Sequence, residues 1–161
     1  MRGMLLAGTA LLLGLGAGAA LAGGAGPPPL DHKQVAFGRT VYKEYCASCH
    51  GPHGEGQPNW QEPNAQGDMP APPHNATGHT WKHADSMLYR IVAGGWRDPF
   101  NKSRQLTMPS FGDQLTPAQI RAVITYLKTL WTPEERKFQW EETEVRGGFP
   151  SSSAASHQPG D

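Results

Sequence analysis

The sequence predicts an all-α fold of three to five helices. Apolar residues recur three and four positions apart along three segments, which is the spacing of one face of an α-helix. Threonine–proline pairs, which are typical helix starts, stand at the beginning of the last segment and directly after it. The chain of 161 residues shows no internal repeat and no convincing strand pattern, so a sheet is not expected.

The first helix is expected to begin near Asp31, which can cap it with Gln34 three residues on. Its apolar face is formed by Val35, Gly38, Val41, Tyr42 and Tyr45. A second helix is expected over 85–93, and Gly94-Gly95 provides its stop. The apolar residues of this helix are Met87, Leu88, Ile91 and Val92.

The last core helix has the clearest start signal, a capping box at 116–119 with proline as the first helical residue. Leu115 and Ile120 can form a hydrophobic staple across this start. Its buried stripe is predicted to hold Ile120, Val123, Ile124, Leu127, Leu130 and Trp131. Residues 132–135 repeat the capping pattern, so a short outer helix is expected to end near Trp140.

Cys46, Cys49 and His50 form a Cys-x-x-Cys-His motif, and the chain has no other cysteine. On a helical turn the two thiols lie on one face and can add to the two vinyl groups of a single porphyrin. The imidazole of His50 then reaches the iron from the same side. The motif therefore predicts one covalent haem c, with His50 as a ligand of the metal.

Other interpretations explain this motif less well. A disulfide between Cys46 and Cys49 leaves the adjacent His50 without a role. A thioredoxin-like redox pair needs alternating strands and helices around it, which the flanking sequence does not show. A structural zinc site needs a second ligand pair, and the chain has no further cysteines.

The sequence divides into four parts. Residues 1–22 are predicted to be a signal peptide, with Arg2 before an apolar stretch and a small-residue cleavage pattern at its end. An uncleaved membrane anchor is the alternative. A Gly/Pro linker follows at 23–30, a haem domain at 31–140 and a disordered tail at 141–161. Because c-type haem is attached outside the cytoplasm, a periplasmic or otherwise extracytoplasmic location is expected.

Composition narrows the classes of partner. Lys and Arg total 14, Asp and Glu total 14, and loss of Arg2 with the leader makes the remainder slightly acidic. This balance argues against nucleic-acid binding by bulk charge. Hydrophobic residues are 37% of the chain, many of them in the leader, so a core of side chains alone would be thin. We expect the protein without haem to be poorly folded.

A haem that only transfers electrons needs a second axial ligand, and a thioether stabilises ferrous iron. Met69, Met87 and Met108 are the candidates. Met87 falls on a helical apolar face, where a methionine usually packs. Met69 and Met108 precede prolines in irregular segments, and Met108 comes shortly before the last core helix. Met108 is therefore the predicted cofactor-binding residue and metal ligand, with Met69 as its main rival.

The order of these features resembles that of class I (mitochondrial-like) c-type cytochromes with a single haem, over about residues 35–131. The resemblance is carried by Gly38 and Tyr42, by the Cys-x-x-Cys-His motif, by Gly51, Gly54 and Gly56, by Met108-Pro109-x-Phe111, and by Tyr126-Leu127-Lys128.

The resemblance implies the cytochrome c fold, in which the first and last core helices cross near a glycine. Gly38 suits that crossing because it lacks a Cβ atom, and Tyr42 and Tyr126 would pack beside it. The family also implies a proline carbonyl that accepts the Nδ1 proton of His50. Pro58 is the expected acceptor, with Pro52 as the alternative.

The chain departs from small members of the family at 59–82, which is expected to be part of a long loop around the haem edge. His79 and His83 have the spacing of a helical metal site, but solvated loop histidines or donors to the haem propionates are the favoured explanation. A distal histidine in place of Met108 is a further alternative. Candidate contacts to the haem edge are Trp60, Trp81, Trp96, Arg97 and Asn101.

The predicted function is an exported carrier of single electrons, not an enzyme. Ligation by His50 and Met108 leaves no open position for a substrate, so outer-sphere transfer is favoured. Its partners are expected to be exported or membrane-bound redox proteins such as an oxidase or reductase, met in small, transient contacts. The alternatives are an electron-input subunit of a larger oxidoreductase, a small haem peroxidase, or a sensor that uses the histidine-rich loop.

Overall fold

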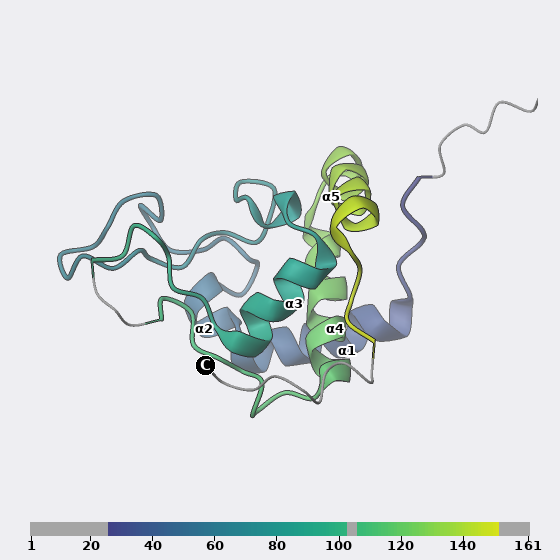
Figure 1. The fold of residues 1–161 in the computed structure, drawn as a ribbon, viewed down its shortest axis with the longest axis horizontal. Coiled ribbons are helices and arrows are strands. Elements are labelled where there is room, and N and C mark those ends of the chain that lie inside the picture. The colour runs from purple at the N-terminus through teal and green to yellow at the C-terminus, as the bar shows by residue number, and fades with distance from the viewer. Residues whose placement is uncertain (1–25, 103–105, 152–161) are drawn as a thin grey trace, which may run out of the picture.

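Helices and long loops make up the described part of the chain, in agreement with the predicted all-α class (Figure 1). The computed structural model describes residues 26–102 and 106–151. The α-helices are α1 (His32–Tyr45), α2 (Ala47–His50), α3 (Asp85–Gly94), α4 (Pro117–Leu127) and α5 (Pro133–Arg146), with short 3-10 helices η1 (Thr80–Lys82) and η2 (Lys128–Leu130). The predicted signal peptide lies outside the described residues, as do the start of the linker and the end of the tail.

Helices α1 and α4 cross at Gly38, and the hydrophobic core is built around this crossing (Figure 1). A Cβ atom at Gly38 would overlap the backbone carbonyl of Ala122 on α4. The rings of Tyr42 and Tyr126 lie 5.2 Å apart beside the crossing. The glycine crossing and its two flanking tyrosines are therefore confirmed.

The helix starts follow the local signals. Asp31 accepts a hydrogen bond from the backbone N–H of Gln34, and the complete capping box at Thr116 starts α4. Helix α3 presents its apolar face to α4. The buried side chains contributed by these three helices include Val41, Leu88, Val92, Ile120, Val123, Ile124 and Leu127. Within the described residues, no helix combines the length and apolarity needed to cross a membrane.

Helix α5 corrects the predicted start of the tail. The chain was expected to lose regular structure at Glu141, yet α5 continues to Arg146. Polar contacts hold the extra turns. The buried side chain of Gln139 donates to the carboxylate of Asp85 on α3, and the hydroxyl of Thr143 accepts from the backbone N–H of Asp85. A hydropathy pattern does not reveal contacts of this kind. Phe149 then packs on the core cluster.

A nearly buried ion pair joins the start of α3 to η2. The ammonium of Lys128 lies 2.7 Å from a carboxylate oxygen of Asp85, and the two side chains are 16% and 8% exposed. Removing one partner of such a pair leaves the other charge buried without compensation.

We expect Lys128→Met to lower the free energy of unfolding by about 3 kcal/mol, because the buried Asp85 would lose its ion-pair partner. Urea unfolding of the haem-loaded protein measures this loss. Lys137→Met is the matched control, since its partner Glu141 and Lys137 itself are both more than half exposed, and a change of about 0.5 kcal/mol or less is expected. Equal losses in the two variants would contradict a special role for the Asp85 pair.

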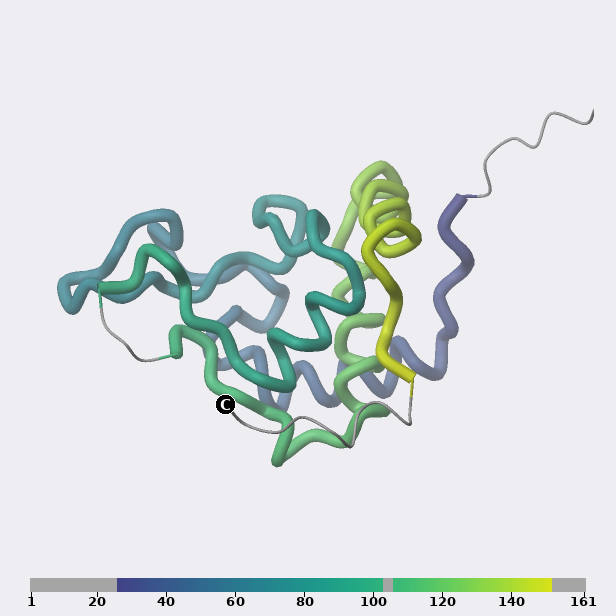
Figure 2. The backbone as a smooth tube through the Cα atoms, viewed as in Figure 1, coloured from purple at the N-terminus to yellow at the C-terminus, as the bar shows by residue number. Residues whose placement is uncertain are grey.

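Two long loops complete the domain and run outward together (Figure 2). The backbone of Gly67 accepts from Lys102, and the Asn101 side chain accepts from the N–H of Met69. Closer to the helices, the chain near 71–75 lies against 54–57, with the N–H of His74 donating to the carbonyl of Gly54. This return of the chain forms one wall of the site described next.

Candidate cofactor site

The Cys-x-x-Cys-His motif forms one helical turn at the junction of α1 and α2. The backbone N–H of His50 donates to the carbonyl of Cys46 at 2.9 Å, and the N–H of Cys49 donates to the same oxygen at 3.1 Å. Both cysteines are free thiols, Cys46 buried and Cys49 exposed. The predicted arrangement of two thiols and an imidazole on one turn is therefore confirmed.

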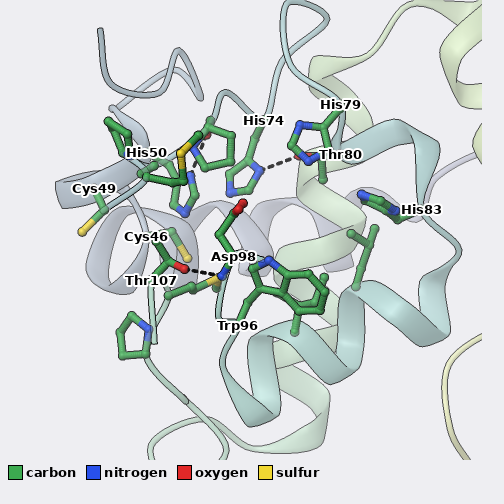
Figure 3. Close-up of a pocket in the computed structure, with 18 of the residues that line it drawn as sticks. Cys46, Cys49, His50, His74, His79, Thr80, His83, Trp96, Asp98 and Thr107 are labelled. Carbon is green, nitrogen blue, oxygen red and sulfur yellow. Dashed lines mark hydrogen bonds between the residues drawn. The ribbon is translucent and has the colours of Figure 1, made fainter. Parts of the chain in front are cut away.

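A cavity of about 320 Å³ opens beside this turn. Its wall is mostly apolar and comes from the motif, from α3 and from the segments 69–74, 96–100 and 107–111. Figure 3 shows the motif on one side of the cavity, with His74, His79 and His83 along a second side and Trp96, Asp98 and Thr107 along a third. A largely apolar cofactor suits a cavity lined in this way.

The orientation of His50 fits a metal ligand. Its Nδ1 hydrogen-bonds the carbonyl oxygen of Pro72 at 2.8 Å, and because a carbonyl only accepts, Nδ1 carries the proton. Burial lowers the pKa of His50, and the bond to Pro72 opposes that shift. The ring is therefore neutral at pH 7, and its Nε2 lone pair is available to iron.

The expected acceptor for this bond was wrong. Neither Pro58 nor Pro52 receives the Nδ1 proton. The backbone of Gly56 still bonds the carbonyl of His50, but the loop then runs outward, and the acceptor of the Nδ1 proton is Pro72, on the returning part of the loop. Pro72 was missed because the partners are 22 residues apart, a span that depends on how the whole loop folds. The sequence did contain one indication of this acceptor: Pro72 and Pro73 are consecutive prolines, which hold the chain extended.

Burial raises the pKa of the Cys46 thiol to about 12, and the neighbouring Cys49 adds to the shift. Cys46 is therefore a thiol, not a thiolate, at neutral pH. Among the described residues no group of three or more His, Cys, Asp or Glu side chains is placed to hold a metal ion. The donor set fits a porphyrin held through two thiols and one imidazole.

All three candidate methionines line the cavity. Met87 does so from α3, while Met69 and Met108 do so from the loops. The backbone of Met108 is fixed on both sides by an antiparallel bridge to Trp96, with two N–H···O bonds of 2.9 Å. The choice of Met108 over Met69 stays a prediction.

Some of the loop residues that were candidates for haem contacts line the cavity, and the others do not. His79 and His83 line the cavity, with ring centroids 5.4 Å apart and nearly perpendicular planes, and burial lowers the pKa of each. Of the predicted haem-edge residues only Trp96 lines the cavity. The others do not reach it: Trp60 stacks on His79, Trp81 packs on Phe138, Asn101 bonds Met69, and Arg97 is exposed.

His74 also lines the cavity, and its contact with His50 was not predicted from the sequence. Its ring stacks on that of His50 with centroids 3.9 Å apart and planes 27° apart. Burial, and then the neighbouring His50 and His79, hold the pKa of His74 well below its ordinary value. Its place two residues after Pro72 brings it to the same face of the motif.

Comparisons with known proteins agree on a family. The model of the family described as Cytochrome c matches residues 35–131. Two curated relatives, the Cbb3-type cytochrome c oxidase subunits FixP of Sinorhizobium medicae (strain WSM419) and Rhizobium meliloti (strain 1021), are 31% and 30% identical over 104 residues. Each alignment covers 64% of this chain and 32% of the relative, so the chain spans about a third of their length.

A solved structure is also similar, that of cytochrome cL from the marine methylotroph Methylophaga aminisulfidivorans MPT. It is 18% identical with a TM-score of 0.42, and the match covers 75% of this chain and 72% of the other.

Proposed function

The chain belongs to the cytochrome c family, and from that membership we propose that it is an exported carrier of single electrons whose iron is held by His50 and Met108. The haem c of this family is covalently bound, and it supplies a one-electron couple between ferric and ferrous iron. Cys46 and Cys49 attach it through two thioether bonds, since they are the chain's only cysteines.

The hydrogen bond from His50 Nδ1 to Pro72 is the observation that carries this proposal. It fixes the tautomer and leaves Nε2 facing away from the carbonyl. A carbonyl acceptor makes the imidazole a better donor to the metal than a free histidine would be. His50 is buried, so water has little access to the imidazole that would bind the iron.

Met108 is proposed as the second ligand because it lines the cavity and its backbone is held in place by hydrogen bonds, which would keep the thioether near the iron. Both its N–H and its carbonyl are bonded to Trp96, directly after the end of α3. A thioether bound from that segment would leave no open iron position and would disfavour substrate chemistry. Electron transfer without bond making is then the activity the site supports best.

We expect Met108→Ala to abolish the far-red sulfur-to-iron charge-transfer band of the ferric protein, because the thioether is its source. Met108→His is expected to lower the reduction potential, since imidazole stabilises ferric iron relative to a thioether. An optical redox titration of purified holoprotein measures both. Met69→Leu and Met87→Leu are matched controls in the same cavity, and both should keep the band. If Met69→Leu loses the band and Met108→Ala keeps it, the second ligand is Met69 and not Met108.

The partners are proposed to be exported or membrane-bound redox proteins. The two relatives are named as subunits of Cbb3-type oxidases, which favours an oxidase as acceptor and keeps an electron-input subunit as the second candidate function. An open-site peroxidase is separable from both: fast cyanide binding by high-spin ferric protein would support it and contradict ligation by Met108. Export is proposed from the signal-peptide pattern at 1–22.

A further inference from the structure

The proximal imidazole is held by a single short segment in two different ways. Pro72 accepts the Nδ1 proton of His50 in the plane of the ring, and His74 covers a face of the same ring (Figure 3). The hydrogen bond to Pro72 sets which nitrogen of His50 carries the proton. It is a single contact of 2.8 Å, so by itself it restrains rotation of the ring about the Cβ–Cγ bond only weakly.

The ring of His74 is itself fixed from several directions. Its Nδ1 hydrogen-bonds the hydroxyl of Thr80 at 2.9 Å. Its backbone N–H donates to Gly54, and its carbonyl accepts from the indole of Trp131, both at 2.8 Å. The edge of Tyr42 packs against it with centroids 6.3 Å apart. A side chain tied down in this way forms a rigid surface for its neighbour.

We propose that His74 is a positioning residue that sets the orientation of the His50 imidazole plane, an inference that rests on His50 being the iron ligand of the proposed function. A flat ring stacked on the face of another flat ring resists its rotation about the Cβ–Cγ bond. With haem bound, the orientation of the His50 ring would set how the imidazole overlaps with the d orbitals of the iron. His74 therefore acts on the electronic state of the iron through His50.

Ordinary core packing explains the position of His74 less well. Leucine would fill similar space without a polar group to bury, whereas a buried imidazole needs the Thr80 hydroxyl to offset its loss of hydration. Space filling does not need a planar side chain, but stacking does. A planar and a non-planar apolar substitute therefore separate the two roles.

The test compares haem-loaded variants by ferric electron paramagnetic resonance and by the hyperfine-shifted methyl signals of the haem in proton NMR. His74→Leu removes the planar ring, and His74→Phe restores it without the polar nitrogen. Ile124→Ala is the matched control, because Ile124 is a fully buried core residue of α4 that does not line the cavity. It is expected to lose stability to urea without changing the iron signals.

We expect His74→Leu to shift and broaden the g-values and to change the spread of the methyl signals, with His74→Phe close to the wild type. Unchanged signals in His74→Leu, or the same change in Leu and Phe variants, would overturn the inference. If His74→Leu fails to take up haem, Thr80→Val serves instead, because it removes the hydrogen bond that holds the His74 ring. A change in the g-values and in the spread of the methyl signals relative to the wild type supports the role, and unchanged signals refute it. A wild-type spectrum without an axial histidine would instead refute the proposed function.

Discussion

Replacing both Cys46 and Cys49 with serine is expected to leave the protein with no haem that survives denaturation. These two sulfur atoms are the only ones in the chain that can form thioether bonds in a Cys-x-x-Cys-His motif. The imidazole of His50 could still bind iron, but such a bond is reversible and is lost when the chain unfolds. The measurement is haem staining of a denaturing gel, together with the intact mass of the purified protein.

Ser48→Ala is the matched control for that experiment. It changes the same helical turn, but its exposed hydroxyl makes only a long contact of 3.9 Å to the sulfur of Cys49 and cannot form a thioether bond. Full staining and the mass of a haem adduct are expected in this variant. Either single cysteine variant should weaken attachment, because one thioether remains. Full haem staining of the double variant would contradict covalent attachment through these cysteines.

Gly38→Val is expected to cost about 3 kcal/mol or more in the free energy of unfolding, as overpacking of a closed helix crossing does. The added Cβ would overlap the carbonyl of Ala122 and approach the Cβ of Tyr126 to 3.0 Å. A backbone carbonyl cannot turn aside as a flexible side chain can, so α1 and α4 would have to separate. Urea or thermal unfolding of the haem-loaded protein measures the loss.

The control for Gly38 is Gly94→Ala, at the end of α3. A Cβ atom there meets nothing within 4 Å, so the variant should match or slightly exceed the wild type in stability. The contrast separates the general effect of replacing a helical glycine from the specific effect of the crossing. A stability loss at Gly94 as large as that at Gly38 would argue against the close approach of α1 and α4.

The features predicted correctly are those that neighbouring residues determine. Asp31 and Thr116 cap their helices through contacts three residues away, and the thiols of the motif share a single turn. Such signals are complete within a few residues, so they survive any uncertainty about the rest of the fold. Gly38 was also identified, but through the family resemblance.

The features that were missed depend on where distant segments meet. The bond from His50 to Pro72 and the stacking of His74 arise only once the long loop has returned to α2. Helix α5 was ended too early because the residue it buries, Gln139, is polar and finds its partner Asp85 on another helix. Hydropathy cannot reveal a buried amide that is satisfied by a carboxylate 54 positions away.

The crossing of α1 and α4 has a consequence for the order in which the chain matures. Gly38 and Ala122 lie near opposite ends of the domain, so the core cannot close until α4 has been synthesised and has diffused back to α1. The turn that carries Cys46, Cys49 and His50 needs only bonds within itself. Its thiols are therefore accessible while the chain is still extended, whereas in the closed domain Cys46 is buried.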